Sequence, residues 1–127
     1  MIGAIIGDIV GSRFEFGAAP QQGFELFTPD CSYTDDTICT IAIADAVLNE
    51  RDYQESLLDW CRRYPDPMGG YGRRFYQWIN TDNPQPTDSF GNGSAMRVSP
   101  IGWLFDEWED VIEEAKKSAI VSHNHPE

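Results

Sequence analysis

The chain has 127 residues, of which 41% are hydrophobic and 13% aromatic, so it can build the core of one domain and does not read as disordered. Nine Lys and Arg against 21 Asp and Glu give a net charge of −12, which disfavours nucleic acid and anionic membranes as partners and favours sites for divalent cations. Three cysteines without a CxxC pair, and no apolar run near the roughly 18 residues of a membrane helix, lead us to expect a cytoplasmic protein.

The first predicted helix covers residues 2–14. One of its faces is a stripe of small residues, which would let another backbone approach closely; the stripe is Gly3, Gly7 and Gly11. A second face is polar and carries Asp8, Ser12 and Glu15 at spacings of four and three. The segment that follows, residues 16–33, is predicted to be a loop because it is rich in Gly, Pro and Gln.

Thr34 is a suitable N-cap for a second helix through residues 35–50. Its expected apolar face is Ile38, Ile41, Ala42, Ala44 and Leu48. A third helix is predicted over residues 53–64, ended by the prolines that follow. The side chains expected to point inward from it are Leu57, Cys61 and Tyr64.

A Gly-rich turn over residues 68–72 precedes a short predicted helix over residues 73–80, and residues 81–93 are a loop by composition. Another helical stretch is expected from Ser94 to Pro100, and a last helix over residues 108–121. The expected apolar stripe of the last helix is Trp108, Val111, Ile112, Ala115 and Ala119. No segment alternates as a strand does, so the pattern predicts an all-α fold.

Two segments carry carboxylates that suit hard cations. Asp35 and Asp36 follow Thr34 at a helix start, and adjacent carboxylates of this kind can share or bridge two ions. The other interpretation is that they stabilise the first turn through the helix dipole. Asp8 and Glu15, on the polar face of the first helix, are either a further ligand and gate or a solvated surface.

Two further segments point to ligand binding. Residues 91–97 (GNGSAMR) place glycines before a helical stretch, where backbone N–H groups can meet an anion such as phosphate. From the spacing alone, a plain turn with a serine helix start is the favoured interpretation. His123 and His125 form an HxH pair that can hold a transition metal, but no matching cluster of Cys or His accompanies it, so zinc is not indicated.

Together, four segments resemble the ADP-ribosylglycohydrolase family, in the family's order and at compatible spacings. They are residues 3–15, 33–37, 91–97 and 122–126. The resemblance implies a compact all-α domain over residues 1–127, an orthogonal helical bundle with a dinuclear Mg²⁺ or Mn²⁺ centre. It also implies cleavage of the glycosidic bond between ADP-ribose and a protein side chain or related acceptor.

The resemblance also assigns roles to residues. Thr34, Asp35 and Asp36 would be metal ligands, and the two aspartates would position the metals for catalysis. Glu15 would lie beside the metals as a gate, a substrate contact or a carrier of protons. The residues that would hold ADP-ribose are Gly91, Asn92, Gly93 and Ser94. His125 would lie against the base or a ribose of the ligand, with His123 as the alternative counterpart.

One family feature is missing from the sequence, namely a later Asp-x-Asp-Thr segment that completes the metal site. Asp35 and Asp36 alone cannot supply the roughly six oxygen ligands of each ion. The chain therefore reads as the N-terminal half of such an enzyme, and we expect a homo-oligomer or a complementing C-terminal half as a partner, besides an ADP-ribosylated protein or a similar small molecule. The alternatives are a non-catalytic module that binds ADP-ribose or a nucleotide, and a protein-interaction unit.

Overall fold

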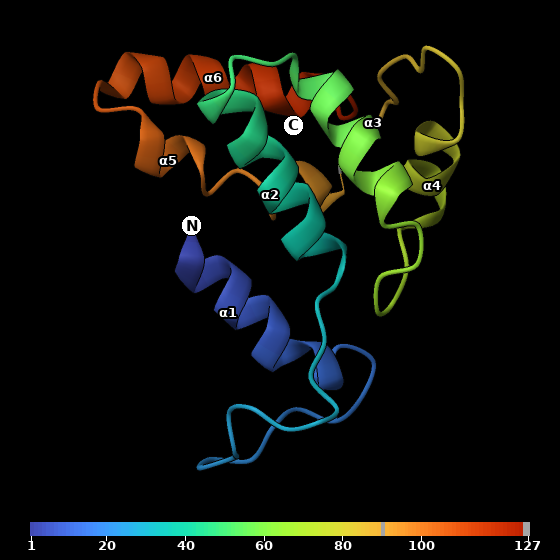
Figure 1. The fold of residues 1–127 in the computed structure, drawn as a ribbon, viewed down its shortest axis with the longest axis vertical. Coiled ribbons are helices and arrows are strands. Elements are labelled where there is room, and N and C mark those ends of the chain that lie inside the picture. Colours follow the sequence, from blue (N-terminus) through green and yellow to red (C-terminus); the bar gives the residue numbers. More distant parts are fainter. Residues whose placement is uncertain (90, 126–127) are drawn as a thin grey trace.

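The structure is a computed structural model that describes residues 1–89 and 91–125. Its helices, shown in Figure 1, are α1 (Ile2–Gly11), α2 (Asp35–Leu48), α3 (Tyr53–Arg63), α4 (Arg73–Ile79), α5 (Ile101–Leu104) and α6 (Trp108–Ile120), with 3₁₀ turns at Ser12–Phe14 and Asn92–Ser94. The described residues form no strand, and a single isolated bridge joins Thr87 to His123. The predicted all-α class is confirmed.

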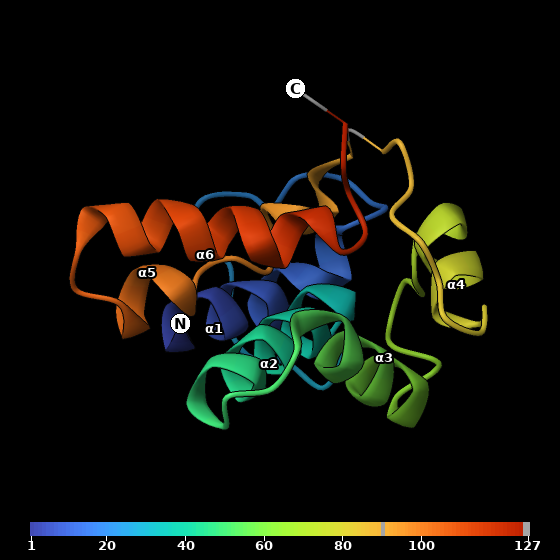
Figure 2. The ribbon, with the colours of Figure 1, turned by 90° about the horizontal axis from the view of Figure 1, so that it is seen from above.

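Helix α2 is the centre of the fold, and its most extensive contact is with α3. Its buried positions lie all around its axis because Ala42, Ala44 and Ala46 let neighbouring elements approach closely. Figure 2 shows α6 beside α5, with α4 at the opposite end of the molecule. The core side chains come from α2 to α5 and are Ile38, Cys39, Ala42, Ile43, Leu57, Cys61, Trp78, Ile79 and Ile101.

Three helices differ from the predicted inward faces. In α3, Tyr64 is wrongly predicted to point inward, since it lies at the C-cap of the helix and is 39% exposed. In α6, Trp108 and Ile112 are wrongly predicted to point inward, since they are 70% and 51% exposed. The helix instead packs through Val111 and Ala115, and it buries Ser118. In α2, Leu48 is exposed because it lies in the last turn, beyond the region that α3 covers.

Helix α1 lies against the beginning of α2 but buries none of its own ten residues, all of which the structure describes. No described atom lies within 4 Å of the position that a Cβ would take at Gly3, Gly7 or Gly11, so the stripe of small residues is open in this chain. The helix ends three residues earlier than predicted and continues as a 3₁₀ turn. Residues 16–33 then extend away from the helices before the chain returns to α2 (Figure 1).

Within the described part of the chain, no helix combines the length and apolar character needed to cross a membrane.

Candidate functional site

The first part of the site is the N-terminus of α2, which is attached to α1 by the carboxylate of Asp8. Oδ1 of Asp8 accepts a hydrogen bond from the hydroxyl of Thr34 at 2.6 Å. Oδ2 accepts one from the backbone N–H of Thr34 at 2.9 Å and one from the hydroxyl of Thr37 at 2.5 Å. Oγ1 of Thr34 in turn accepts from the backbone N–H of Asp36 at 3.2 Å, which confirms Thr34 as the N-cap.

Ser12 makes a second attachment at the same place. Its buried hydroxyl donates to the carbonyl of Ile9 at 2.9 Å and accepts from the backbone N–H of Ser32 at 3.0 Å. The polar face of α1 is therefore not a solvated surface at Asp8 and Ser12. These two side chains hold the end of the long loop and the start of α2 against α1.

Four carboxylates gather where these elements meet, namely those of Asp8, Glu15, Asp35 and Asp36. Burial and the charges of Asp36 and Glu15 raise the pKa of Asp35 to about 6. Burial and the charge of Asp8 raise the pKa of Asp36, and burial followed by the charges of Asp36 and Asp8 raises the pKa of Glu15. None of the four forms an ion pair with a described Lys or Arg. We call these four residues the acidic cluster.

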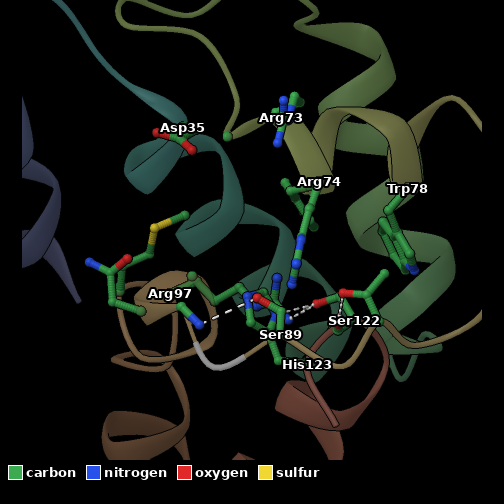
Figure 3. A pocket seen from close by; sticks show the side chains of 15 residues that line it. Asp35, Arg73, Arg74, Trp78, Ser89, Arg97, Ser122 and His123 are labelled. Atoms are coloured by element: carbon green, nitrogen blue, oxygen red, sulfur yellow. Dashed lines mark hydrogen bonds between the residues drawn. The ribbon is translucent and has the colours of Figure 1, made fainter. Parts of the chain in front are cut away.

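Beside the acidic cluster lies a pocket of about 340 Å³. Figure 3 shows that one wall comes from α4 and the opposite wall from the segments around Ser89, Arg97 and His123, while Asp35 reaches the edge of the pocket from α2. Asp35 is thus the residue of the acidic cluster that also lines the pocket. The two parts of the candidate site are joined through this side chain.

Arg97 is fully buried and lines the pocket. Its Nη2 donates to the carbonyl of Ser118 at 2.9 Å and to the hydroxyl of Ser122 at 2.8 Å, and its guanidinium lies 5.7 Å from the centre of the Phe75 ring. The Ser122 hydroxyl is also 2.9 Å from Nδ1 of His123. Burial and the charge of Arg97 lower the pKa of His123, so this imidazole is neutral at pH 7.

The remaining wall is closed by backbone contacts. The backbone N–H and the hydroxyl of Thr87 both donate to the carbonyl of Ser122, at 3.1 and 2.9 Å, and the N–H of Asn124 donates back to the carbonyl of Thr87 at 3.3 Å. At Gly93 a Cβ would lie 3.0 Å from Cε1 and Nε2 of His123. The Gly-rich segment therefore passes against the imidazole at a distance that only glycine allows without displacement.

The structure divides the predicted site residues between these two parts. The pocket is lined by Asp35, Gly91, Asn92 and Gly93, whereas Thr34, Asp36 and Glu15 lie in or beside the acidic cluster. Ser94 and His125 are not among the described residues that line the pocket, and His123 takes the place considered for a histidine. The catalytic, metal-binding and ligand-binding roles assigned to all of these residues stay predictions.

The sequence predicts no role for several residues that line the pocket, among them Arg73, Arg74, Trp78 and Thr87. Arg97 belongs to the segment 91–97, but the sequence predicts no role for its side chain. A signal for the first two was present, because two adjacent arginines follow a Gly-rich turn in a chain of net charge −12. Trp78 and Thr87 carry no such signal, since each is typical of a core or loop position.

The acidic cluster fits a divalent cation in its chemistry but not in the number of ligands. Carboxylate oxygens without a cationic partner are the donors that Mg²⁺ and Mn²⁺ prefer. Within the described residues, however, no three side chains of His, Cys, Asp or Glu converge closely enough to hold an ion. The Thr34 hydroxyl is also already committed to Asp8 and the N–H of Asp36. The chain by itself supplies part of such a site.

Comparison with known proteins identifies the family of the chain. The family model described as ADP-ribosylglycohydrolase matches residues 1–127. The chain is similar to proteins named ADP-ribosylhydrolase ARH3, with 28% identity to that of Xenopus tropicalis, 29% to that of Mus musculus and 27% to that of Homo sapiens. Each match covers 97% of this chain but only 42–43% of the relative, so the chain spans less than half the length of these relatives. The match over residues 1–127 shows that the chain belongs to the ADP-ribosylglycohydrolase family.

Proposed function

We propose that this chain forms the ADP-ribose-binding part, and the N-terminal share of the metal centre, of a hydrolase that releases ADP-ribose from a protein side chain. The family membership and the relatives named ADP-ribosylhydrolase support this activity. The observation that carries the proposal is the position of Asp35, which belongs to the acidic cluster and also lines the pocket. A ligand in the pocket thereby meets the carboxylates at one end.

In this arrangement the pocket takes the nucleotide portion of ADP-ribose, and the ribose that carries the acceptor lies at the Asp35 edge. Gly91, Asn92 and Gly93 offer a wall without bulky side chains, so a phosphate can approach the backbone closely. His123, which is neutral at pH 7, offers a ring nitrogen to a ribose hydroxyl or the base. Ser94 and His125 are proposed to take part next to these residues.

Asp35 and Asp36 are proposed to hold Mg²⁺ or Mn²⁺, with Thr34 beside them. When bound, such an ion polarises ribose hydroxyls and makes a neighbouring water more acidic. The remaining ligands would come from a C-terminal part or from another copy of the chain. The four carboxylates bring up to four negative charges, which matches the charge of two divalent ions.

Hydrolysis breaks the bond between the anomeric carbon and the acceptor and forms a bond from that carbon to a water oxygen, through a positively charged transition state. Asp35 and Asp36 would contribute by holding the metal ions beside the reacting ribose. Glu15 lies at the rim of the same cluster, where burial and the neighbouring charges raise its pKa. We assign to it the transfer of a proton to or from the acceptor.

The test is release of free ADP-ribose from peptides that carry ADP-ribose on serine or arginine. The chain is assayed with Mg²⁺ or Mn²⁺ and with EDTA, and its mass is measured under the same conditions by light scattering. We expect metal-dependent release, lost in Asp36→Ala and retained in Asp106→Ala, which changes an exposed aspartate outside the cluster. Release that Asp36→Ala leaves intact would contradict the site.

If no ADP-ribose is released, titration of the folded chain with ADP-ribose distinguishes two explanations. If the folded wild-type chain binds ADP-ribose and releases none, the chain is a nucleotide-binding module. If it neither binds nor releases ADP-ribose, the proposed function is wrong for this chain. The mass measurement shows whether an active sample is a monomer or an oligomer that completes the metal site.

A further inference from the structure

Positive charge is scarce in this protein and is concentrated at the pocket. Of the nine Lys and Arg, three line it: Arg73, Arg74 and Arg97. The other arginines are all engaged in hydrogen bonds or ion pairs; they are Arg13, Arg51, Arg62 and Arg63. Arg73 and Arg74, in contrast, have no hydrogen bond or ion pair within the described part of the chain.

Two of the residues that line the pocket carry buried donors without acceptors. Among the described residues, five buried side-chain nitrogen or oxygen atoms lack a hydrogen-bond partner. Three of them belong to residues that line this pocket, namely Nε1 of Trp78 and both Nε and Nη1 of Arg97. Buried polar groups are nearly always satisfied, so these three donors need acceptors from a bound ligand or from ordered water.

Arg74 is the unpaired cation best placed to meet such a ligand. Figure 3 shows its side chain extending from α4 into the pocket, toward Ser89 and His123, whereas Arg73 points away from them. Arg74 and Trp78 also line the adjoining cavity of about 490 Å³, so Arg74 stands where the two cavities meet. Arg74 is also exposed, so a ligand in either cavity can approach this residue.

The negative charge of the acidic cluster makes a cation such as Arg74 necessary for binding an anionic ligand in the pocket. A ligand with a diphosphate must settle next to an acidic cluster in which no described Lys or Arg offsets the carboxylates. When no metal ion is bound, the carboxylates repel such an anion, and a cation in the pocket offsets this repulsion. A guanidinium presents a planar set of donors that matches phosphate oxygens, and Arg97 adds charge at the pocket.

We propose that Arg74 determines specificity at this pocket by binding the diphosphate of the ligand, with the buried donors of Arg97 and Trp78 completing the subsite. The identification of the ligand as ADP-ribose rests on the proposed function. The subsite itself rests on the unpaired guanidinium and the open donors. Arg74 therefore selects ligands that carry a diphosphate over the uncharged nucleoside.

The experiment titrates inorganic pyrophosphate, ADP-ribose and adenosine into the wild-type chain by calorimetry, in EDTA. The variants are Arg74→Gln, Arg74→Lys and Lys116→Gln. Lys116→Gln is the matched control, because Lys116 is an exposed cation on α6 that has no partner among the described residues and does not line the pocket. We expect Arg74→Gln to weaken pyrophosphate binding tenfold or more and to leave adenosine unchanged. Arg74→Lys should retain an intermediate affinity, and Lys116→Gln should bind as the wild type does.

Equal binding of pyrophosphate by the wild type and Arg74→Gln overturns the proposal, as does an equal loss in Lys116→Gln, which would reflect net charge alone. A wild-type chain that is shown by circular dichroism to be folded but binds no pyrophosphate also overturns the proposal.

The experiment also distinguishes failure of the proposed function from failure of the subsite. If pyrophosphate binds through Arg74 but ADP-ribose is neither bound more tightly nor released, the subsite is supported and the hydrolase activity is not. If ADP-ribose is bound and released equally well by Arg74→Gln, the hydrolase stands and the subsite does not.

Discussion

The carboxylate of Asp8 binds both the backbone N–H and the hydroxyl of Thr34, a residue 26 positions further along the chain. Because α1 buries no residue of its own, these hydrogen bonds and those of Ser12 replace the apolar packing that normally positions a helix. The same hydrogen bonds fix the start of α2, where Asp35 and Asp36 lie. The geometry of the acidic cluster therefore depends on one side chain of α1.

Replacing Asp8 with alanine should lower the free energy of unfolding by about 1–3 kcal/mol, because three donors lose their acceptor and Thr34 and Thr37 are buried. Urea denaturation followed by circular dichroism measures the change. The matched control is Asp106→Ala, an exposed aspartate in a connecting segment, which should change stability little. A loss in Asp8→Ala no larger than in the control would contradict the role given to Asp8.

Asp35→Asn should stabilise the chain in EDTA, even though it removes a residue assigned to the site. The pKa of Asp35 is raised to about 6 by burial and by the charges of Asp36 and Glu15, so its ionised form costs stability at pH 7. Removing that charge should raise the free energy of unfolding by roughly 1–2 kcal/mol. Thermal unfolding of Asp35→Asn and of the exposed Asp66→Asn gives the comparison. An unchanged or lowered melting temperature in Asp35→Asn would show that the carboxylates do not repel one another as described.

The charge of Asp45 should stabilise the folded state, whereas the charge of Asp35 destabilises it, because the pKa of Asp45 is lowered and that of Asp35 is raised. Asp45 accepts hydrogen bonds from Nε1 of Trp60 at 3.0 Å and Nδ2 of Asn49 at 2.7 Å, and it pairs with Arg51. The bond from Trp60, followed by those from Asn49 and Arg51, lowers the pKa of Asp45 below its ordinary value. The folded state therefore binds this proton less tightly than the unfolded state, and the stabilisation is present above pH 4 and lost as the pH falls further.

Asp45→Asn should accordingly lower the free energy of unfolding by about 1 kcal/mol at pH 7. The difference from the wild type should shrink below pH 4, where Asp45 of the wild type becomes protonated. Unfolding curves at pH 7, 5 and 3, read from tryptophan fluorescence, make the comparison. A deficit that keeps its size at pH 3 would mean that the charge of Asp45 has no part in holding α2 against α3.

Gly93→Ala should weaken ADP-ribose binding and lower stability by about 1–3 kcal/mol, because the new Cβ would lie 3.0 Å from the His123 ring and push it or the loop aside. The control is Gly102→Ala in α5, where no described atom lies within 4 Å of the added Cβ. That variant should be neutral or stabilising by up to about 1 kcal/mol, as alanine favours a helix. Calorimetric titration and thermal unfolding of both variants test this. Equal behaviour of the two would argue against a close approach of loop and imidazole.

Local signals in the sequence were sufficient for most helices. The Thr34 cap, the prolines after residue 64 and the apolar period of the last helix are properties of a few neighbouring residues, and the helices begin and end within a few positions of the prediction. The segment around Ser94 was harder. Its glycines and Pro100 break the pattern so often that only a 3₁₀ turn and the four residues of α5 form there.

The tertiary arrangement was predictable only in part. The acidic cluster and the Gly-rich wall stood out as motifs, and both lie at the site. The exposure of Trp108 and Ile112 depends on which face of α6 meets the core, and periodicity identifies an apolar face without its partner. The convergence of Arg74, Trp78 and Arg97 on one pocket is a product of folding, since these residues come from different elements.

The contacts of Arg97 determine when the pocket can form during synthesis of the chain. Its guanidinium is held by Ser118 and Ser122, and Thr87 is bridged to the residues that follow α6, so one wall of the pocket depends on the last ten or so described residues. During synthesis α1 to α3 can pair as soon as they leave the exit tunnel, while Arg97 stays hydrated until residue 122 emerges. A nascent chain halted before Ser118 would therefore have its acidic cluster assembled and its pocket still open.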